Sequence, residues 1–202
     1  MSDPAGPRVL VGDLLVATPN LLDPNFEHTV VLLLDVDDNG ALGVVLNRPS
    51  SVPVGDVLPD WAELAGAPGV LFQGGPVSTD SALAVGASAP VPTDVPTPPA
   101  GDAAAEPVGF RRLYDHVGIV DLDTPTPIIG PALRRLRIFA GYAGWGARQL
   151  AAEIAEGSWY VVPSAPADLF GDDPLDLWKR VLRRQPGELA WVSTRPADPS
   201  MN

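Results

Sequence analysis

Gly141-Tyr142-Ala143-Gly144-Trp145-Gly146 is the stretch from which the organisation of this chain can be worked out. An apolar run, Leu136–Ala140, precedes it, and a helical pattern begins at Ala147. These neighbours predict a strand that enters a helix through a turn almost without Cβ atoms. Glycine permits positive φ angles and lets another group approach the backbone closely. That group is either a ligand or another strand, and the residues leave both open.

The length and composition of the chain limit the classes of protein to which it can belong. At 202 residues it is expected to form one domain, spanning 1–202, that is long enough to bury a core. It contains no cysteine, which excludes disulfides, thiolate metal sites and cysteine nucleophiles and fits a cytoplasmic location. No apolar run reaches the length of a membrane span, and the first residues lack the pattern of a signal peptide, so no membrane partner is expected.

The charge balance argues against direct nucleic-acid binding. The chain carries 13 basic and 25 acidic residues, a net charge of −12, and such a field repels polyanions. The densest basic group lies on a predicted helix, Pro174–Gln185, which has an apolar stripe of Leu175, Trp178 and Leu182. The stripe leaves the cations of this helix to solvent, and we interpret a second basic group, before the glycine stretch, in the same way. The two groups are Lys179, Arg180, Arg183 and Arg184, and Arg134, Arg135 and Arg137.

Short apolar runs separated by turn formers predict a chain built mainly of strands. Thr29–Val36 is apolar almost throughout, as in a strand buried on both faces. Asp37-Asp38-Asn39-Gly40 separates it from the apolar run Ala41–Leu46, and Asn-Gly between such runs predicts a hairpin. Further strands are expected at Gly12–Ala17, Val70–Phe72, Ala82–Ala87, Val117–Asp121, Arg137–Ala140, Trp159–Val162 and Leu189–Ser193.

Helices are expected between these hairpins. Ala147–Glu156 has one apolar face at helical spacing, and Val54–Leu58 and Asp60–Ala65 are short helical pieces. Hairpins interspersed with helices favour an α+β fold. Residues 88–108 are rich in proline and are expected to form a flexible excursion, and 195–202 to form a frayed tail.

Two glycine stretches are candidate sites for an anion. Gly74-Gly75-Pro76 forms either a backbone nest or a sharp turn between strands, and we favour the turn. The stretch 141–146 would offer free N–H groups if it opens a helix, although it has neither the Lys-Ser/Thr of a P-loop nor the G-x-G-x-x-G pattern. Close structural packing is the competing explanation for both stretches.

No catalytic constellation stands out. The two histidines, His28 and His116, are far apart, and no G-x-S-x-G or zinc-binding His spacing is present. Asp121 with Asp123, and the group 35–38, place carboxylates in alternation, which can hold Mg²⁺ or act as acid and base but more often ends a strand. No metal and no cofactor is therefore predicted.

Four motifs in order resemble the AlgH family, also called the YqgE-like family, of small bacterial proteins. The resemblance covers roughly residues 12–184, and four ordered motifs make a chance match improbable. The motifs are Gly12–Pro19 with Leu22–Phe26, Gly40–Pro49, Phe72–Val77, and Gly141–Gly146 with Gln149-Leu150 and Glu153-Ile154.

The resemblance implies a cytosolic, single-domain α+β protein. Its fold would be a bent, bifurcated, mostly antiparallel sheet that forms a pseudo-barrel with helices packed outside. It implies no reaction and supplies no catalytic residues, and the family's label as a regulator is an association only. This chain departs from the family pattern at His28, where an arginine is usual, and in the proline-rich residues 88–108.

The sequence therefore favours a non-enzymatic regulatory or interaction protein that binds a small ligand or a protein partner. One alternative is a metal-assisted hydrolase that uses aspartate carboxylates, and another is a transcriptional regulator, which the acidic charge disfavours. The oligomeric state is left open. The expected binding site requires the two glycine stretches to meet in space, and it consists of Asn47, Arg48, Gly74, Gly75, Pro76, Tyr142, Gly144 and Trp145.

Overall fold

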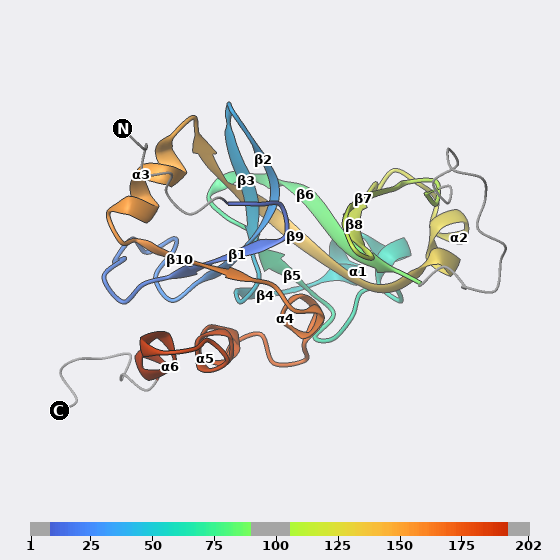
Figure 1. Ribbon diagram of the computed structural model, residues 1–202. Coiled ribbons are helices and arrows are strands. Elements are labelled where there is room, and N and C mark those ends of the chain that lie inside the picture. The colour runs from blue at the N-terminus through green and yellow to red at the C-terminus, as the bar shows by residue number, and fades with distance from the viewer. Residues whose placement is uncertain (1–8, 90–105, 194–202) are drawn as a thin grey trace, which may run out of the picture.

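The computed structural model describes residues 9–89 and 106–193, and strands dominate it (Figure 1). Ten strands form one sheet, in the order β10-β1-β2-β3-β9-β6-β8-β7, with β5 on a side branch between β9 and β4. Their bounds are β1 Asp13–Ala17, β2 Val30–Asp37, β3 Gly40–Val45, β4 Pro49–Pro53, β5 Val70–Gln73, β6 Val77–Ser88, β7 Phe110–Tyr114, β8 Val117–Val120, β9 Leu133–Gly146 and β10 Trp159–Pro163.

Short helices cover the sheet. Three of them begin with at most two residues between them and the preceding strand, and each of these three buries at least one apolar side chain. The helices are α1 Val54–Val57, α2 Thr126–Ile129, α3 Gln149–Ala155, α4 Pro166–Phe170, α5 Leu177–Arg183 and α6 Glu188–Val192, with single 3₁₀ turns η1 at Pro59–Trp61 and η2 at Gly130–Ala132.

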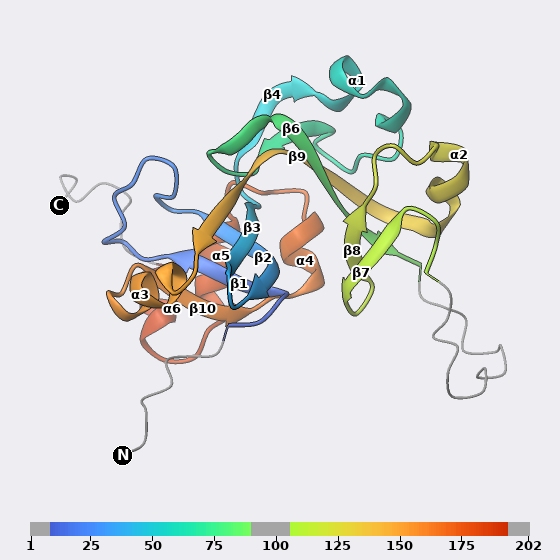
Figure 2. The same cartoon turned by 90° about the horizontal axis from the view of Figure 1, so that it is seen from above.

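The long strand β9 joins the two parts of the sheet. Its first part pairs antiparallel with β6, and its last residues pair antiparallel with β3. At Phe139 and Ala140 it also pairs in parallel with β5, so the sheet bifurcates there. Figure 2 shows β9 running diagonally from the side of β1–β3 to the hairpin β7–β8. The result is a curled, mostly antiparallel half-barrel in an α+β fold, as expected.

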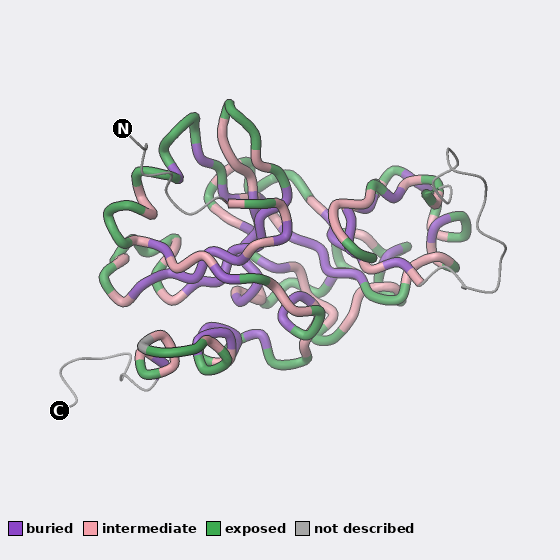
Figure 3. The backbone as a smooth tube through the Cα atoms, in the orientation of Figure 1, coloured by how far each residue is buried: buried purple, intermediate pink, exposed green. Residues whose placement is uncertain are grey.

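The central strands are buried on both faces (Figure 3). Alternate residues such as Leu14 and Leu32 pack against α4 and α5 in one apolar cluster. Their neighbours Leu15 and Leu33 pack in a second cluster with Leu150 of α3. The continuous apolar run of β2 is therefore confirmed as a strand with no solvent-facing side over its first residues. A third cluster lies under α1, η1 and α2 at the other end of β9.

The predicted hairpin between β2 and β3 is present. Asp37 pairs with Gly40 in the ladder. The Asp37 carboxylate accepts the backbone N–H groups of Asn39 at 2.7 Å and Gly40 at 3.0 Å, which closes the turn. These bonds lower the pKa of the Asp37 carboxyl below its usual value, with the side-chain bond from Asn39 as the largest cause.

The stretch 141–146 is not the turn that we expected. It continues β9, and Gly144 and Gly146 pair with Leu42 and Gly40 of β3. Three glycines argue against a strand on propensity, but here the ladder to β3 supplies the hydrogen bonds. The turn into helix α3 comes two residues later, at Arg148 (φ 64°), so the expectation that 141–146 caps a helix is wrong.

The carboxyl-terminal region also differs from expectation. Helix α5 begins at Leu177, not at Pro174, and its buried face is Leu177, Trp178, Val181 and Leu182, while Leu175 is 74% exposed. The expected strand at Leu189–Ser193 is helix α6, which packs against α5. A five-residue apolar run cannot distinguish a strand from a buried helix by periodicity alone.

One basic residue that we expected in solvent is buried. Arg137 is only 4% exposed, because β9 turns its side chain toward the large apolar cluster, where the guanidinium lies 4.2 Å from the centre of the Phe72 ring. On α5 and just beyond it, Arg184 pairs with the buried Asp168, and Arg180 donates to the carbonyl of Asp173 at 3.0 Å. These arginines serve the fold and do not form a free basic face.

The proline-rich excursion is shorter than predicted at its first end. Strand β6 continues through Ser88, which is buried, and residues 90–105 lie outside the described part of the chain. The expected tail at 195–202 also lies outside it. Strand β7 was missed. A single domain over 1–202 stays a prediction.

Candidate functional site

The two glycine stretches meet where the chain crosses β9. Strands β5 and β6 lie on opposite sides of β9, and only Gly74-Gly75-Pro76 connects them. A Cβ on Gly74 would stand 2.2 Å from the carbonyl oxygen of Gly141, and one on Gly75 would stand 2.2 Å from the carbonyl carbon of Tyr142. Real Cβ atoms do not come so close, so glycine is required on the crossing segment.

The backbone N–H and carbonyl groups of Gly74 in the crossing segment are already hydrogen-bonded. The N–H of Gly74 donates to the carbonyl of Ala140, and its own carbonyl accepts from Val45, both at 2.9 Å. A free nest of N–H groups at Gly74 is therefore not available for an anion, and close strand packing explains this glycine.

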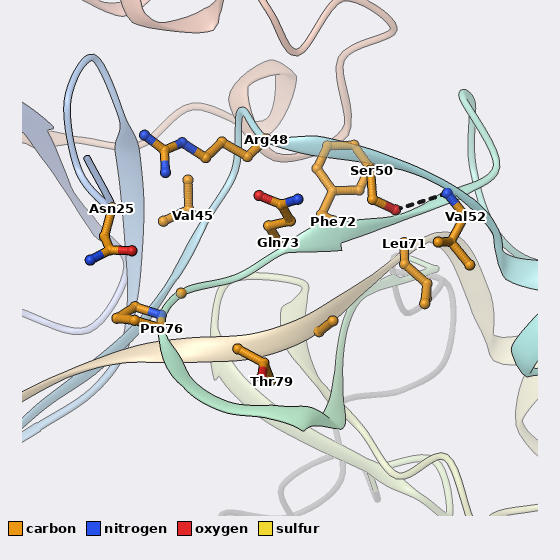
Figure 4. Close-up of a pocket in the computed structure, with 12 residues that line it drawn as sticks. Asn25, Val45, Arg48, Ser50, Val52, Leu71, Phe72, Gln73, Pro76 and Thr79 are labelled. Atoms are coloured by element: carbon orange, nitrogen blue, oxygen red, sulfur yellow. Dashed lines mark hydrogen bonds between the residues drawn. The ribbon is translucent and has the colours of Figure 1, made fainter.

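A pocket of about 390 Å³ opens beside the crossing, between β4–β5 and the start of β6 (Figure 4). We call it the Arg48 pocket. Arg48, Ser50 and Gln73 lie along one side, and Pro76 and Thr79 lie along the other (Figure 4). The remaining lining residues are Asn25, Val45, Val52, Leu71, Phe72, Gly75 and Ala140.

Arg48 holds a loop and keeps donors free. Its Nη2 donates to the carbonyls of Pro24 at 2.9 Å and Glu27 at 3.3 Å, which fixes the loop between β1 and β2. Partial burial lowers the pKa of the Arg48 guanidinium, and Glu27 and Asp23 oppose that shift, so the group stays charged at neutral pH. In the described part of the chain, Nε and Nη1 of Arg48 have no hydrogen-bond acceptor.

Three other polar side chains in the pocket are equally free. Across residues 9–89 and 106–193, no hydrogen-bond partner is found for the side chains of Asn25, Gln73 or Thr79. Ser50 is used locally, because its hydroxyl accepts the N–H of Val52 at 3.1 Å. The buried ring of Phe72 supplies apolar surface. Such a mixture of apolar wall and free polar groups is typical of small-molecule sites.

The structure places three of the predicted site residues in this pocket: Arg48, Gly75 and Pro76. Asn47 is buried and structural. Its side chain accepts the N–H of Val30 at 2.9 Å and donates to the carbonyl of His28 at 2.8 Å, which anchors the start of β2. Gly74 packs against β9 behind the pocket.

The other three predicted residues lie away from the pocket. Tyr142 packs against the large apolar cluster, and Gly144 lies exposed in the ladder to β3. Trp145 belongs to the second cluster, 5.9 Å from the ring of Trp159. The Glu153 carboxylate accepts both indole N–H groups, at 2.9 Å from Trp145 and 2.8 Å from Trp159.

Sequence reasoning missed the free polar groups. Gln73 and Asn25 lie inside two of the motifs quoted above, so a polar side chain beside a predicted turn was a usable signal. Thr79 gave none, because only the fold brings the exposed start of β6 opposite β5.

Among the aspartates of the hydrolase alternative, Asp121 and Asp37 close turns, and Asp35 lies within strand β2. Asp121 accepts the N–H of Asp123 at 3.0 Å and the hydroxyl of Thr124 at 3.2 Å, and Asp37 closes the β2–β3 turn. Among the described residues, no group of three or more His, Cys, Asp or Glu side chains is placed to hold a metal ion. None of the helices in the described part is long and apolar enough to cross a membrane.

Comparison with known proteins settles the family. Residues 14–190 match the family described as AlgH-like. The chain belongs to the AlgH-like family. A UPF0301 protein of Streptomyces coelicolor is 58% identical over 193 residues, which cover 96% of this chain and 95% of the relative. A UPF0301 protein of Thermobifida fusca is 50% identical, with 96% of each chain covered.

Two solved structures share the fold. The crystal structure of protein DIP2367 from Corynebacterium diphtheriae matches with a TM-score of 0.82 and 33% identity, over 93% of each chain. The solution structure of the AlgH protein from Pseudomonas aeruginosa matches with a TM-score of 0.64 and 26% identity, over 97% of each chain. The names of these relatives state no reaction.

Proposed function

We propose that this AlgH-like chain is a non-enzymatic interaction protein whose Arg48 pocket binds a small polar ligand. The observation that carries the proposal is the convergence of unpartnered polar groups from four segments on one pocket. The crossing at β9 brings Gln73 and Thr79 together, and Asn25 lies on the loop that Arg48 holds. Arg48 is half-buried and would normally have acceptors for its donors, whereas Asn25, Gln73 and Thr79 are exposed. Free Arg48 donors in a pocket with three further polar side chains point to a ligand.

The free groups favour a ligand rich in acceptor oxygens. Arg48 offers two donor nitrogens and a positive charge, and the Asn25 and Gln73 amides and the Thr79 hydroxyl add further donors. A guanidinium pairs most strongly with a carboxylate or phosphate oxygen. We therefore propose a compact organic acid or phosphorylated metabolite, with a small apolar part against Phe72.

The residues that line the pocket favour binding over catalysis. The pocket holds one basic residue and no acid–base pair, so a binding event fits it better than a reaction. We propose that occupancy of the pocket regulates contact with a protein partner, and that the protein works in the cytoplasm. The net charge of −12 disfavours direct binding to nucleic acid.

The test is a thermal-shift screen of the purified chain. The panel holds organic acids, phosphorylated metabolites, nucleotides and divalent metals. A ligand at one hundred times its dissociation constant stabilises the folded state by roughly 2.7 kcal/mol, which is a shift of several degrees. The proposal predicts hits among the acids or phosphorylated compounds, and a screen without such hits contradicts it.

Variants locate the site of any hit. Gln73→Ala and Thr79→Ala remove exposed side chains that have no partner in the described residues, so both are expected to fold like the wild type and to weaken binding. Asp80→Ala is the matched control, one residue beyond Thr79 on the exposed start of β6 and outside the pocket. Equal binding by all three variants and the wild type would show that the ligand binds elsewhere.

A further inference from the structure

The loop between β1 and β2 contains a tight turn at residues 23–27, which we call the Asp23 turn. The N–H groups of Phe26 and Glu27 both donate to the Asp23 carbonyl at 2.8 Å. The N–H group of Asn25 donates to the Asp23 carboxylate at 2.7 Å. An aspartate side chain that binds the backbone two residues ahead is a common way of closing such a turn. Because these bonds tie the residues to one another, the Asp23 turn is expected to move as one unit.

Arg48 ties the Asp23 turn to the rest of the fold. Among residues 9–89 and 106–193, it is the only hydrogen-bond partner of this turn from outside the β1–β2 loop. Its bonds go to the Pro24 and Glu27 carbonyls, whereas its Nε and Nη1 atoms have no acceptor in the same residues. One side chain therefore holds the turn and offers free donors to a ligand in the Arg48 pocket.

Two neighbouring side chains of the Asp23 turn lie in different surroundings. Asn25 lines the Arg48 pocket (Figure 4), and its amide has no partner among the described residues. The ring of Phe26 packs in the second apolar cluster, with its centre 6.1 Å from that of Trp145 and 5.5 Å from that of Trp159. A shift of the turn therefore changes the pocket and the packing around the two indoles together.

The two tryptophans extend this connection to helix α3. The Glu153 carboxylate of α3 accepts the indole N–H groups of both. Leu150 of the same helix packs in the cluster that contains both indoles and Phe26. Helix α3 is exposed at Ala152 and Ala155. The aromatic pair therefore joins the Asp23 turn to an element that has an exposed face.

We propose that the Asp23 turn couples occupancy of the Arg48 pocket to the packing of Trp145 and Trp159 and to helix α3. A ligand whose oxygens accept from Arg48 and Asn25 ties the turn to the sheet at a second point. The Asn25 contact exists only while the turn is in place, and a contact made in one state alone is what lets a ligand shift an equilibrium. The ring of Phe26 is then held more firmly against the two indoles. This inference rests on the function proposed for the Arg48 pocket, and it names the element that binding there regulates.

Arg48→Gln tests the link without any ligand. Loss of the guanidinium frees the Asp23 turn, so we expect the Phe26 and Glu27 amides to exchange with solvent about tenfold faster. Water then reaches the indoles, and tryptophan emission is expected to move to longer wavelength. Gln73→Ala is the matched control, because Gln73 lines the same pocket and has no hydrogen bond to the turn. Exchange and emission that are alike in Arg48→Gln and Gln73→Ala would overturn the proposal.

A double-variant cycle with Phe26→Leu, which removes the ring that contacts both indoles, shows whether the signal passes through Phe26. In this background Arg48→Gln is expected to speed amide exchange as before and to leave emission unchanged. The other tryptophans of the chain contribute equally to both backgrounds and cancel. An emission change of the same size in both backgrounds would contradict the role of Phe26. Should Phe26→Leu fail to fold, a ligand titration of the wild-type protein carries the test.

That titration uses inorganic phosphate and malonate, which represent the two proposed classes of ligand. At least one of them is expected to raise the midpoint of thermal unfolding and, at saturation, to slow exchange at Phe26 and Glu27 about tenfold. Ser164 and Ala167 supply reference amides, because they line a separate pocket of about 850 Å³ between α4, the β7–β8 hairpin and the start of β1. Exchange at these two amides is expected to stay unchanged.

The possible outcomes separate the inference from the proposed function. A probe that raises the midpoint of thermal unfolding but changes neither emission nor exchange at Phe26 and Glu27 would overturn the inference and leave the function standing. Stabilisation by neither probe would contradict the proposed function and the inference with it. Slower exchange at Ser164 and Ala167 alone would place the probe in the other pocket and overturn both.

Discussion

The carbonyl oxygen of Gly75 lies 2.7 Å from the point where a Cβ on Gly141 would stand. Gly141 has a φ of 70°, a conformation that side chains disfavour, so both sterics and backbone strain require glycine there. This contact is the point at which the chain crosses β9 from β5 to β6. It also fixes the position of the wall of the Arg48 pocket.

Substitution at the crossing is expected to destabilise the fold. Gly141→Ala adds a clash and a strained φ, and the expected loss in the free energy of unfolding is roughly 2–4 kcal/mol. Gly144→Ala is the matched control on the same strand, because its Cβ would meet only the Tyr142 side chain at 3.5 Å. Urea unfolding is expected to leave that control within about 0.5 kcal/mol of the wild type. Equal stability of the two variants would contradict the crossing as the reason for Gly141.

Removal of Arg184 from its ion pair with Asp168 is expected to destabilise the fold strongly. The Asp168 side chain is 1% exposed and that of Arg184 is 32% exposed, at an N–O distance of 2.5 Å. Arg184→Met leaves a buried carboxylate without its charge partner, for which the expected cost is roughly 3–5 kcal/mol. Lys179→Met, on the exposed side of α5, is the control. Equal denaturant midpoints for the two variants would argue against a stabilising role of this ion pair.

Glu153 is expected to stabilise the second apolar cluster. Its carboxylate accepts the indole N–H groups of Trp145 and Trp159, which are 6% and 3% exposed. Glu153→Leu strands two buried donors, each costing about 1–3 kcal/mol, whereas Glu153→Gln keeps an acceptor oxygen and loses less. Glu156→Leu alters an exposed carboxylate at the end of the same helix. Unfolding curves in which Glu153→Leu matches Glu156→Leu would contradict this role.

Ionisation of Tyr114 is expected to lower the stability of the fold at alkaline pH. Its folded pKa is raised, mainly by burial, so its contribution is fully present below the unfolded value near 10 and is lost as pH rises through the folded pKa. Arg137 has the opposite sign, because its folded pKa is lowered to about 10 and stability from it increases above that value. The difference between wild type and Tyr114→Phe isolates Tyr114. Stability curves that stay parallel above pH 10 would contradict the raised pKa.

Local pattern predicted most strands, because apolar runs and turn formers report burial and chain reversal directly. The β2–β3 hairpin was visible in Asp37–Gly40 for that reason. The role of 141–146 was not visible, because whether a glycine-rich stretch is a turn or a strand depends on which strand lies beside it. The neighbouring strand is β3, which lies far from this stretch in the sequence. Leu175 was misplaced because the start of α5 decides which residues share its face.

The candidate site was predictable only in part. Arg48, Gly75 and Pro76 were found because turns and cations are conspicuous in a sequence. Trp145 was conspicuous too, but alternation along β9 directs it to the opposite side, toward Trp159. The burial of Arg137 was missed because it lies close to two other arginines in the sequence, and a basic cluster is normally exposed. Only the register of β9 shows that its side chain is buried.

Chemical-shift mapping by two-dimensional NMR, with the best organic acid or phosphorylated compound from the thermal-shift screen, tests the central claim most directly. Binding in the Arg48 pocket predicts shifts concentrated at the amides of Arg48, Gln73 and Thr79, with Ser164 and Ala167 unmoved. Shifts confined to Ser164 and Ala167, with Arg48, Gln73 and Thr79 unmoved, would contradict the proposed function.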